Sequence, residues 1–231
     1  LDHLGEHTNT PEEAQQATDD IFATLDALGA DSAARGNVSI KLTQIGLGLD
    51  ESFCAQNLER ILARAKKNNT FIRIDIEDTP YTDKTINLYY AMREKGYENA
   101  GMAVQSYLYR AEADTRRMIM NGTRIRLVKG AYAEGDLTPA QVEDQMRNCS
   151  QHLLLCARDP AIATVRDEHL LRTIDEFVAD VKTVRKDSFE IQMLYGMCEP
   201  IRRAVIENGQ RVRIYLPTGR LLPGMAYLIR R

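Results

Sequence analysis

Eight short β-rich runs recur along the chain, and segments with helix punctuation separate them. The runs are residues 1–6, 38–44, 71–77, 101–106, 124–130, 161–165, 189–195 and 211–217. Each run has the length of a strand, and each segment between two runs is long enough to return the chain for a parallel neighbour. Eight such units favour an α/β fold, a TIM-like (β/α)8 barrel in a single domain, over an open doubly wound sheet.

The helix boundaries carry their own signals. Thr10-Pro11-Glu12-Glu13 predicts a capping box, in which the threonine caps, the proline occupies the first turn and the second glutamate closes the box. Thr138-Pro139-Ala140-Gln141 repeats the signature. Four glycines are predicted to end helices, namely Gly29, Gly96, Gly122 and Gly209.

Composition narrows the class of partner. Lys and Arg total 30 against 33 for Asp and Glu, so the net charge of −3 gives no general attraction for nucleic acid or anionic lipid. The four cysteines show neither CxxC pairs nor metal-ligand spacing with the four histidines, which predicts reduced thiols, no metal site and a cytoplasmic protein. No apolar stretch approaches the roughly 18 residues that span a bilayer, so membrane contact is expected to be at most peripheral, at the inner face. The abrupt start at Leu1 and end at Arg231 predict a domain truncated at both ends.

Charged side chains share the inner face of several predicted strands. In the third run Ile72, Ile74 and Ile76 oppose Arg73, Asp75 and Glu77, because side chains alternate along a strand. The same alternation in other runs places Lys41, Arg126, Arg213 and Tyr215 inside. Barrel interiors are normally apolar, and burying unpaired charge costs several kcal/mol, so these groups need partners.

Two explanations of the inner charges stay open. Lys41, Arg73, Asp75 and Arg126 could satisfy one another as a structural ion network. Alternatively they meet in one cavity and bind a ligand, which position favours: Lys41, Asp75, Gln105 and Lys129 fall toward the carboxyl ends of their strands, where barrel enzymes build their sites.

The segment Arg126-Leu127-Val128-Lys129-Gly130-Ala131-Tyr132 carries two cations into a glycine turn and an aromatic residue. Gly130 lets the backbone approach a bulky planar or phosphorylated ligand, although a plain strand end with a satisfied lysine has the same composition. The heptapeptide resembles the fifth-strand signature of proline dehydrogenases. The resemblance extends over the whole chain in matching order, through the segments 1–6, 39–43, 74–75, 103–105, 189–197, 214–219 and 226–231. It is strongest to the domain of bifunctional bacterial proline-utilisation enzymes.

The resemblance implies a catalytic barrel over residues 1–231 with FAD at its carboxyl-terminal face. It implies oxidation of L-proline to Δ1-pyrroline-5-carboxylate by hydride transfer from proline C5 to FAD N5, with quinone receiving the electrons. A fused or partner pyrroline-5-carboxylate dehydrogenase is also implied.

Roles are carried over from the family onto matching positions. Asp75 and Arg126 match catalytic residues, the arginine lying near flavin N5. The matched cofactor-binding residues are Ile76, Gln105, Arg126, Lys129, Gly130, Ala131, Thr164, Val165 and Gln192. The matched substrate-binding residues are Lys41, Leu127, Tyr132, Leu194, Tyr215, Tyr227, Arg230 and Arg231, and Glu6 matches a glutamate linked to Lys41.

The chain departs from the family after the sixth run, where Ala-Thr-His-Asp is usual and Ala163-Thr164-Val165-Arg166-Asp167 stands instead. The flavin-contacting histidine is therefore missing, and either Arg166 takes over a polar contact or FAD binds more weakly. Two other functions fit a barrel with inner lysines. One is a Schiff-base lyase or aldolase using Lys41 or Lys129, and the other is a non-catalytic flavin- or proline-binding module.

Overall fold

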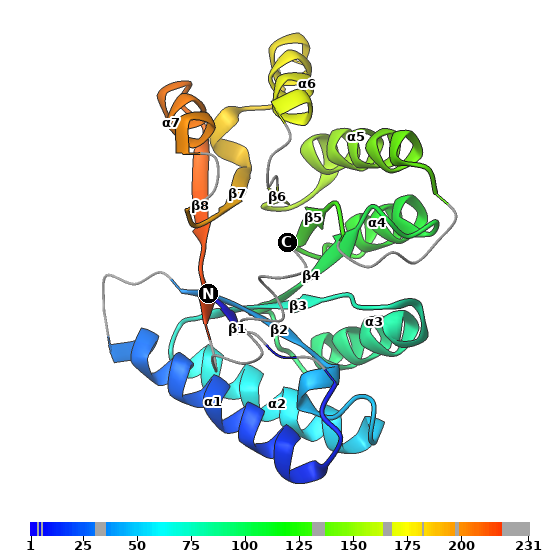
Figure 1. The fold of residues 1–231 in the computed structure, drawn as a ribbon, viewed down its shortest axis with the longest axis vertical. Coiled ribbons are helices and arrows are strands. Elements are labelled where there is room, and N and C mark those ends of the chain that lie inside the picture. Colours follow the sequence, from blue (N-terminus) through cyan, green and yellow to red (C-terminus); the bar gives the residue numbers. More distant parts are fainter. Residues whose placement is uncertain are drawn as a thin grey trace. The chain divides into compact units, whose positions relative to one another are not determined.

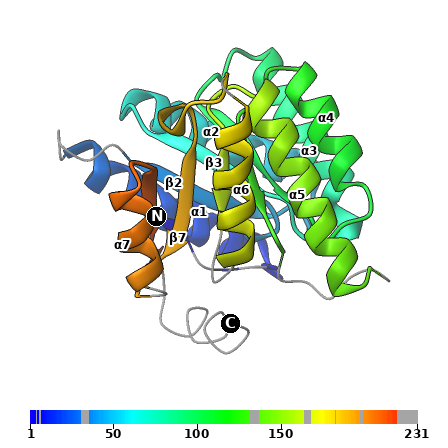
Figure 2. The same cartoon turned by 90° about the horizontal axis from the view of Figure 1, so that it is seen from above.

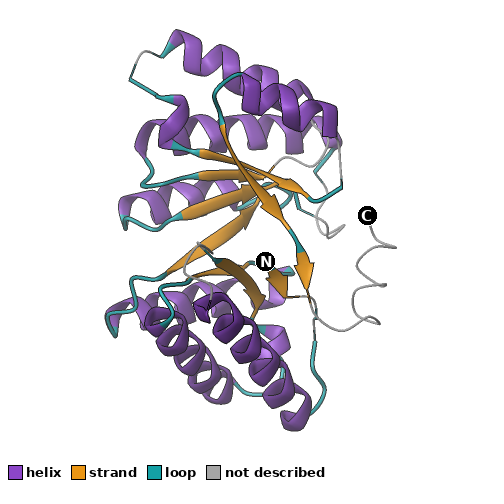
Figure 3. Ribbon diagram, turned by 90° about the vertical axis from the view of Figure 1, so that its left-hand side faces the viewer, coloured by secondary structure: helices purple, strands orange, loops and turns teal. Residues whose placement is uncertain are grey.

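The computed structural model describes residues 1–3, 5, 7–30, 36–130, 137–163, 168–181, 183–196 and 199–218. They form two compact units, the first comprising residues within Leu1–Met102 together with Pro217–Thr218, and the second residues within Ala103–Leu216. Within each unit the helices lie along one side of the strands (Figure 3). None of the described helices is both long and apolar enough to cross a lipid bilayer.

The first unit alternates strands and helices from its start. Its elements are β1 (Asp2–His3), α1 (Pro11–Ala30), β2 (Asn37–Lys41), the 3-10 helix η1 (Thr43–Ile45), α2 (Glu51–Lys67), β3 (Phe71–Asp75), α3 (Thr79–Glu94), the first part of β4 (Ala100–Gln105) and β9 (Pro217–Thr218). Helices α1 and α2 lie side by side (Figure 1).

The second unit continues the same alternation. After the end of β4 it contains α4 (Ala111–Met120), β5 (Ile125–Val128), α5 (Pro139–Cys156), β6 (Ala161–Ala163), α6 (Glu168–Asp180), the 3-10 helix η2 (Lys186–Ser188), β7 (Glu190–Leu194), α7 (Glu199–Glu207) and β8 (Arg211–Tyr215). Helices α4, α5 and α6 lie in sequence beside one another (Figure 2).

The strands follow one another in chain order, as β8-β7-β6-β5-β4-β3-β2-β1-β9. The pairs β1–β2, β2–β3, β5–β6, β6–β7 and β7–β8 are parallel. The predicted eighth run is divided, because β8 pairs with β7 and β9 pairs with β1. Parallel strands joined by helices and ordered along the chain are the arrangement of the (β/α)8 class, which confirms the predicted fold.

The strands are shorter than predicted, mostly at their carboxyl ends. The run predicted over 38–44 is β2 up to Lys41 followed by η1, and the run over 71–77 ends as a strand at Asp75. The residues beyond each strand end leave the sheet and are free to form loops. Sequence composition cannot mark that boundary, because Ile45 of η1 and Ile76 after β3 are as buried as the strand residues.

The capping predictions are confirmed for α5. The Thr138 side chain accepts from Gln141 N at 3.3 Å, and Gln141 Oε1 accepts from Thr138 N at 2.9 Å. For α1 the Thr10 hydroxyl accepts from Glu13 N at 3.2 Å, but Glu13 Oε2 accepts from Asn9 N rather than from Thr10.

The prediction that Gly29 ends its helix is wrong, because α1 continues to Ala30. A Cβ on Gly29 would lie 2.7 Å from Cγ of Asn68, the residue that caps α2. Asn68 Nδ2 donates to Leu25 O at 2.8 Å. The glycine therefore allows α2 to approach α1 closely. Gly96, Gly122 and Gly209 have φ of 87°, 65° and 80° after α3, α4 and α7, as helix-ending glycines do.

Candidate active site

Lys41 stands at the end of β2, between carboxylates from both neighbouring strands. Its Nζ lies 3.5 Å from Asp75 Oδ2 and 3.7 Å from Asp2 Oδ1. The strand register explains the cluster, since Lys41 is directly opposite Asp75 in the β2–β3 pair. The side chains of Lys41 and Asp2 are only 10% and 1% exposed, so both charges are held away from water. Lys41 and Asp75 were predicted to lie together, and the first unit brings them together.

Arg73 lies two residues before Asp75 on the same strand and is buried. Its Nη1 donates to Met102 O at 3.2 Å, and its guanidinium lies 4.9 Å from the Phe71 ring centroid. Arg73 therefore contacts a backbone carbonyl and an aromatic ring. These contacts come in addition to any ion pair that it forms in the structural ion network considered in the sequence analysis.

A second polar cluster joins three loops at the carboxyl ends of β1, β2 and β3. Glu77 is fully buried; its Oε1 accepts from Thr43 N at 3.1 Å, and its Oε2 accepts from the Thr43 hydroxyl. The Thr43 hydroxyl in turn accepts from His7 N at 3.1 Å, while Thr43 O accepts from Thr8 N at 3.3 Å. Burial raises the pKa of Glu77 to about 7, against hydrogen bonds from Thr43 and the charges of Lys41 and His7, which lower it.

Two further ionisable residues, His7 and Asp78, lie close to Glu77, and the three residue types are ones that bind metal ions. The His7 Nε2 atom lies 3.9 Å from Asp78 Oδ1, and these two residues with Glu77 place ligand-type atoms within 4.8 Å of one another. Both Glu77 oxygens are already engaged by Thr43. We therefore interpret the group as a lock between loops.

Arg126 of β5 is buried in the second unit, and its guanidinium carbon lies 5.0 Å from the ring centroid of Tyr215. A cation over an aromatic face is held in place by the ring quadrupole. Tyr215 is opposite Leu194 in the β7–β8 pair, so two of the predicted substrate-binding residues are cross-strand neighbours. Leu127 is fully buried beside Arg126.

Gly130 follows β5 with φ of +107°, a conformation that other residues rarely adopt. A Cβ at this position would lie 2.9 Å from both Gln105 Oε1 and Tyr107 Cβ. Backbone hydrogen bonds from Ser106 N to Val128 O and from Tyr107 N to Lys129 O hold the two chain segments together. The glycine thus allows the backbone to lie against Gln105 and Tyr107. The approach to a bulky ligand that the motif predicts stays a prediction.

Lys129, also predicted to bind the cofactor, is exposed in the described structure. Its Nζ lies 3.8 Å from Glu143 Oε1 of α5, and both side chains are about half exposed. Ile76 is buried directly after β3. The ion pair of Lys129 and the burial of Ile76 neither require nor exclude a ligand. The cofactor-binding roles of both residues stay predictions.

We expect Gly130→Ala to lower the free energy of unfolding by about 2 kcal/mol, from backbone strain together with the collision at Gln105 and Tyr107. Gly122→Ala is the matched control, since Gly122 has φ of +65° but a methyl group added there would meet nothing within 4 Å. We expect it to cost about 1 kcal/mol, the conformational penalty alone. Denaturant unfolding measures both, and equal losses would show that the close approach at Gly130 has no energetic weight.

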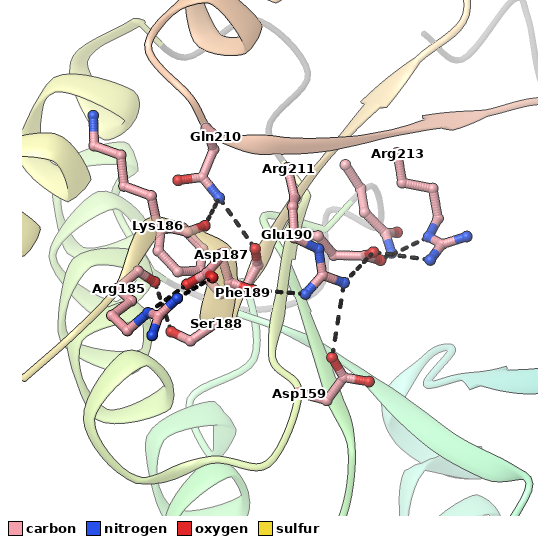
Figure 4. A network of polar contacts seen from close by, with 11 residues as sticks. Asp159, Arg185, Lys186, Asp187, Ser188, Phe189, Glu190, Gln210, Arg211 and Arg213 are labelled. Carbon is pink, nitrogen blue, oxygen red and sulfur yellow. Dashed lines mark hydrogen bonds and ion pairs between the residues drawn. The ribbon is translucent and has the colours of Figure 1, made fainter.

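Gln192 of β7 is buried, and its amide contacts Glu190 on the same strand. Glu190 belongs to a network at the start of β7 and β8 that includes Arg211, Arg213 and Asp159 (Figure 4). Gln210, at the same end, donates to Phe189 O at 3.1 Å. The predicted cofactor residue Gln192 is therefore held by a group that the motif comparison did not single out.

Several predicted residues lie outside the described part of the chain. They are Glu6, Ala131, Tyr132, Thr164, Val165, Tyr227, Arg230 and Arg231, together with Arg166 of the departing motif.

Sequence reasoning missed three contributors to these clusters. Asp2 pairs with Lys41, Thr43 binds Glu77, and Glu190 pairs with Arg213. Each contact joins residues on different elements. Aligning the inward faces of neighbouring strands in register would have indicated Glu190 with Arg213, because both belong to the inward sets of β7 and β8.

Parallel strands in chain order, with buried ionisable side chains at their carboxyl ends, define a (β/α)8-barrel enzyme. A family model described as proline dehydrogenase matches residues 1–231. This chain belongs to the proline dehydrogenase family.

Relatives agree with the family model. Proline dehydrogenase 2 of Bacillus subtilis (strain 168) is 33% identical over 223 residues, covering 95% of this chain and 72% of the relative. Proline dehydrogenase of Deinococcus radiodurans is 35% identical over 239 residues, covering 100% of this chain and 76% of the relative. The bifunctional protein PutA of Escherichia coli (strain K12) is 26% identical, and this chain covers 21% of its length.

Among solved structures, proline utilization A from Bdellovibrio bacteriovorus, inactivated by N-propargylglycine, aligns with a TM-score of 0.87 at 25% identity. The alignment covers 100% of this chain and 29% of that one. Proline utilization A from Bradyrhizobium japonicum, in its D779Y mutant, aligns with a TM-score of 0.89 at 22% identity, which supports the fold. This chain therefore spans less than a third of these larger proteins.

Proposed function

We propose that this chain oxidises L-proline to Δ1-pyrroline-5-carboxylate, with FAD as the hydride acceptor. The observation that carries the proposal is the buried Lys41 cluster at the carboxyl ends of β2 and β3, in a chain that belongs to the proline dehydrogenase family. A fixed buried cation suits a small zwitterion whose carboxylate must be bound in one orientation. The family assignment favours oxidation over a Schiff-base lyase and over a binding module.

The residues of the second unit fit a flavin. Gly130 has no Cβ to meet Gln105, so the backbone after β5 lies close to this buried amide, and Gln192 has a buried amide oxygen with no hydrogen-bond partner among the described residues. We assign these residues and Arg126 to the cofactor, together with Ile76, Lys129, Ala131, Thr164 and Val165. When bound, FAD would supply the acceptor for the two electrons that leave proline C5 as hydride.

The chain's own side chains would bind and orient the substrate. We assign Lys41 to the proline carboxylate, with Asp75 and Asp2 holding its ammonium group in position. Arg126, held by the Tyr215 ring, places a fixed positive charge where electron density arrives, which we propose as its catalytic role. Leu127, Leu194 and Tyr215 are assigned to the walls that exclude water from the ring, with Tyr132, Tyr227, Arg230 and Arg231 from outside the described residues.

Three wider features belong to the same proposal. We propose quinone as the electron acceptor, a pyrroline-5-carboxylate dehydrogenase as a fused or separate partner, and a cytoplasmic location with at most peripheral membrane contact. The likeness to PutA proteins supports the second of these.

The absorbance spectrum of the purified protein tests the proposal. We expect a yellow protein whose flavin band bleaches when L-proline is added without oxygen and returns on adding an artificial electron acceptor. D-Proline is the control for nonspecific reduction. A protein that takes up FAD without bleaching would be a binding module, and one that takes up none would contradict the proposal entirely.

A further inference from the structure

Glu190, which is buried, forms a two-pronged ion pair with the partly exposed Arg213. Glu190 is 8% exposed; its Oε1 accepts from Arg213 Nε at 2.8 Å, and its Oε2 accepts from Nη2 at 2.9 Å (Figure 4). In the β7–β8 register Arg213 is opposite Gln192, and Glu190 is opposite Arg211. The Arg213 side chain therefore reaches diagonally back toward the start of β7. A paired arrangement of this kind fixes both side chains in direction as well as in charge.

The pair also determines how the amide of Gln192 is turned. Gln192 Nε2 donates to Glu190 Oε1 at 2.6 Å. A carboxylate engaged by arginine can only accept, so the amide nitrogen must face Glu190 and the amide oxygen must face elsewhere.

That amide oxygen is a buried acceptor for which the described part of the chain offers no donor. Gln192 is 3% exposed, and its Oε1 has no hydrogen-bond partner among the described residues. A native structure seldom leaves such an atom unsatisfied, because desolvating an acceptor without a partner is unfavourable. On β6 the residue in register with Gln192 is Ala163, whose side chain is a single methyl group. A ligand with an N–H donor is the group that would complete this site.

We propose that Glu190 and Arg213 are positioning residues that present the carbonyl oxygen of Gln192 to the pyrimidine N–H of the flavin ring. The inference rests on the proposed function, in which FAD is the cofactor. The oxidised isoalloxazine ring has acceptors at N1, N5 and both carbonyl oxygens, and its one ring N–H is at N3. The amide oxygen of Gln192 can only accept, so it matches N3–H, whereas a flipped amide would point its NH2 group, a donor, at this N–H.

The experiment compares two cofactors in matched variants. Apoprotein is titrated with FAD and with an FAD analogue methylated at N3, and flavin fluorescence gives each Kd. Gln192→Met removes the acceptor at similar size. Glu190→Gln with Arg213→Met removes the ion pair without leaving one charge unpaired, and Glu190→Gln alone serves if the double variant does not fold.

We expect the unaltered protein to bind FAD about 10-fold more tightly than the methylated analogue, the value of one buried hydrogen bond. We expect that ratio to fall to about 1–2 in Gln192→Met and in the Glu190 variants. If the ion pair had a purely structural role, its loss would weaken the binding of FAD and of the methylated analogue equally, and the ratio of the two Kd values would not change. That result would overturn this inference but not the proposal that the protein binds FAD. Failure of the unaltered protein to bind either flavin would instead overturn the proposed function, and this inference with it.

Discussion

Lys41→Met is expected to lower kcat/KM for L-proline by about 10²–10³-fold and to change turnover of pyrrolidine by less than about 3-fold. Methionine keeps the unbranched stem of lysine and removes its charge. Pyrrolidine is proline without the carboxylate, so it cannot use an ion pair at Lys41. The difference between the two substrates isolates the carboxylate contact from any general disturbance of the cluster formed with Asp2 and Asp75.

The loss for proline should appear mainly in KM if the ion pair acts equally in the bound substrate and the transition state. Lys84→Met is the matched control, because Lys84 has the same side chain in an exposed ion pair with Glu51 at 2.7 Å. We expect that control to leave both substrates unaffected. Equal losses for proline and pyrrolidine in Lys41→Met would contradict the carboxylate role and indicate that Lys41 supports the fold of the site.

The fold was predictable because each strand and helix carries a local signal. Alternation of Ile72 and Ile74 with Arg73 and Asp75 defines a strand with two chemically different faces, and the capping box at Thr138 marks the start of α5. Those signals depend on neighbours in sequence. Parallel topology then follows from the length of the connections.

Partners across strands were less predictable. Lys41 was expected beside Asp75, and register confirms it, but its pairing with Asp2 depends on how β1 is placed against β2. Gly29 shows the same limit in a helix, since a glycine that admits Asn68 looks in sequence like one that ends a helix. Such contacts depend on tertiary distances, which no local pattern encodes.

Glu77 leads to the second large effect, a dependence of stability on pH. Its pKa is raised from the usual 4.5 to about 7, chiefly by burial. Between these two values the folded state holds a proton that the unfolded state has released, so stability is full below pH 4.5 and falls as pH rises to about 7. This difference between the pKa values of the unfolded and folded states corresponds to roughly 3 kcal/mol.

Glu77→Gln is expected to remove this dependence, because glutamine keeps an acceptor for Thr43 N and does not ionise. We therefore expect the unfolding free energy of the variant, relative to the unaltered protein, to rise by about 3 kcal/mol between pH 4.5 and 8. Denaturant unfolding at several pH values measures it. The nearby charges of Lys41 and His7 favour the ionised form of Glu77. Cys54 does not ionise in this pH range, because burial and the neighbouring Glu77 raise the pKa of its thiol.

Glu59→Gln is the control, since Glu59 pairs with Lys95 at 2.5 Å on the surface and its loss removes the same charge. If the two variants gave parallel pH profiles, Glu77 would have to be ionised in the folded protein throughout, and the lock that it forms with Thr43 would be an ordinary charged hydrogen bond.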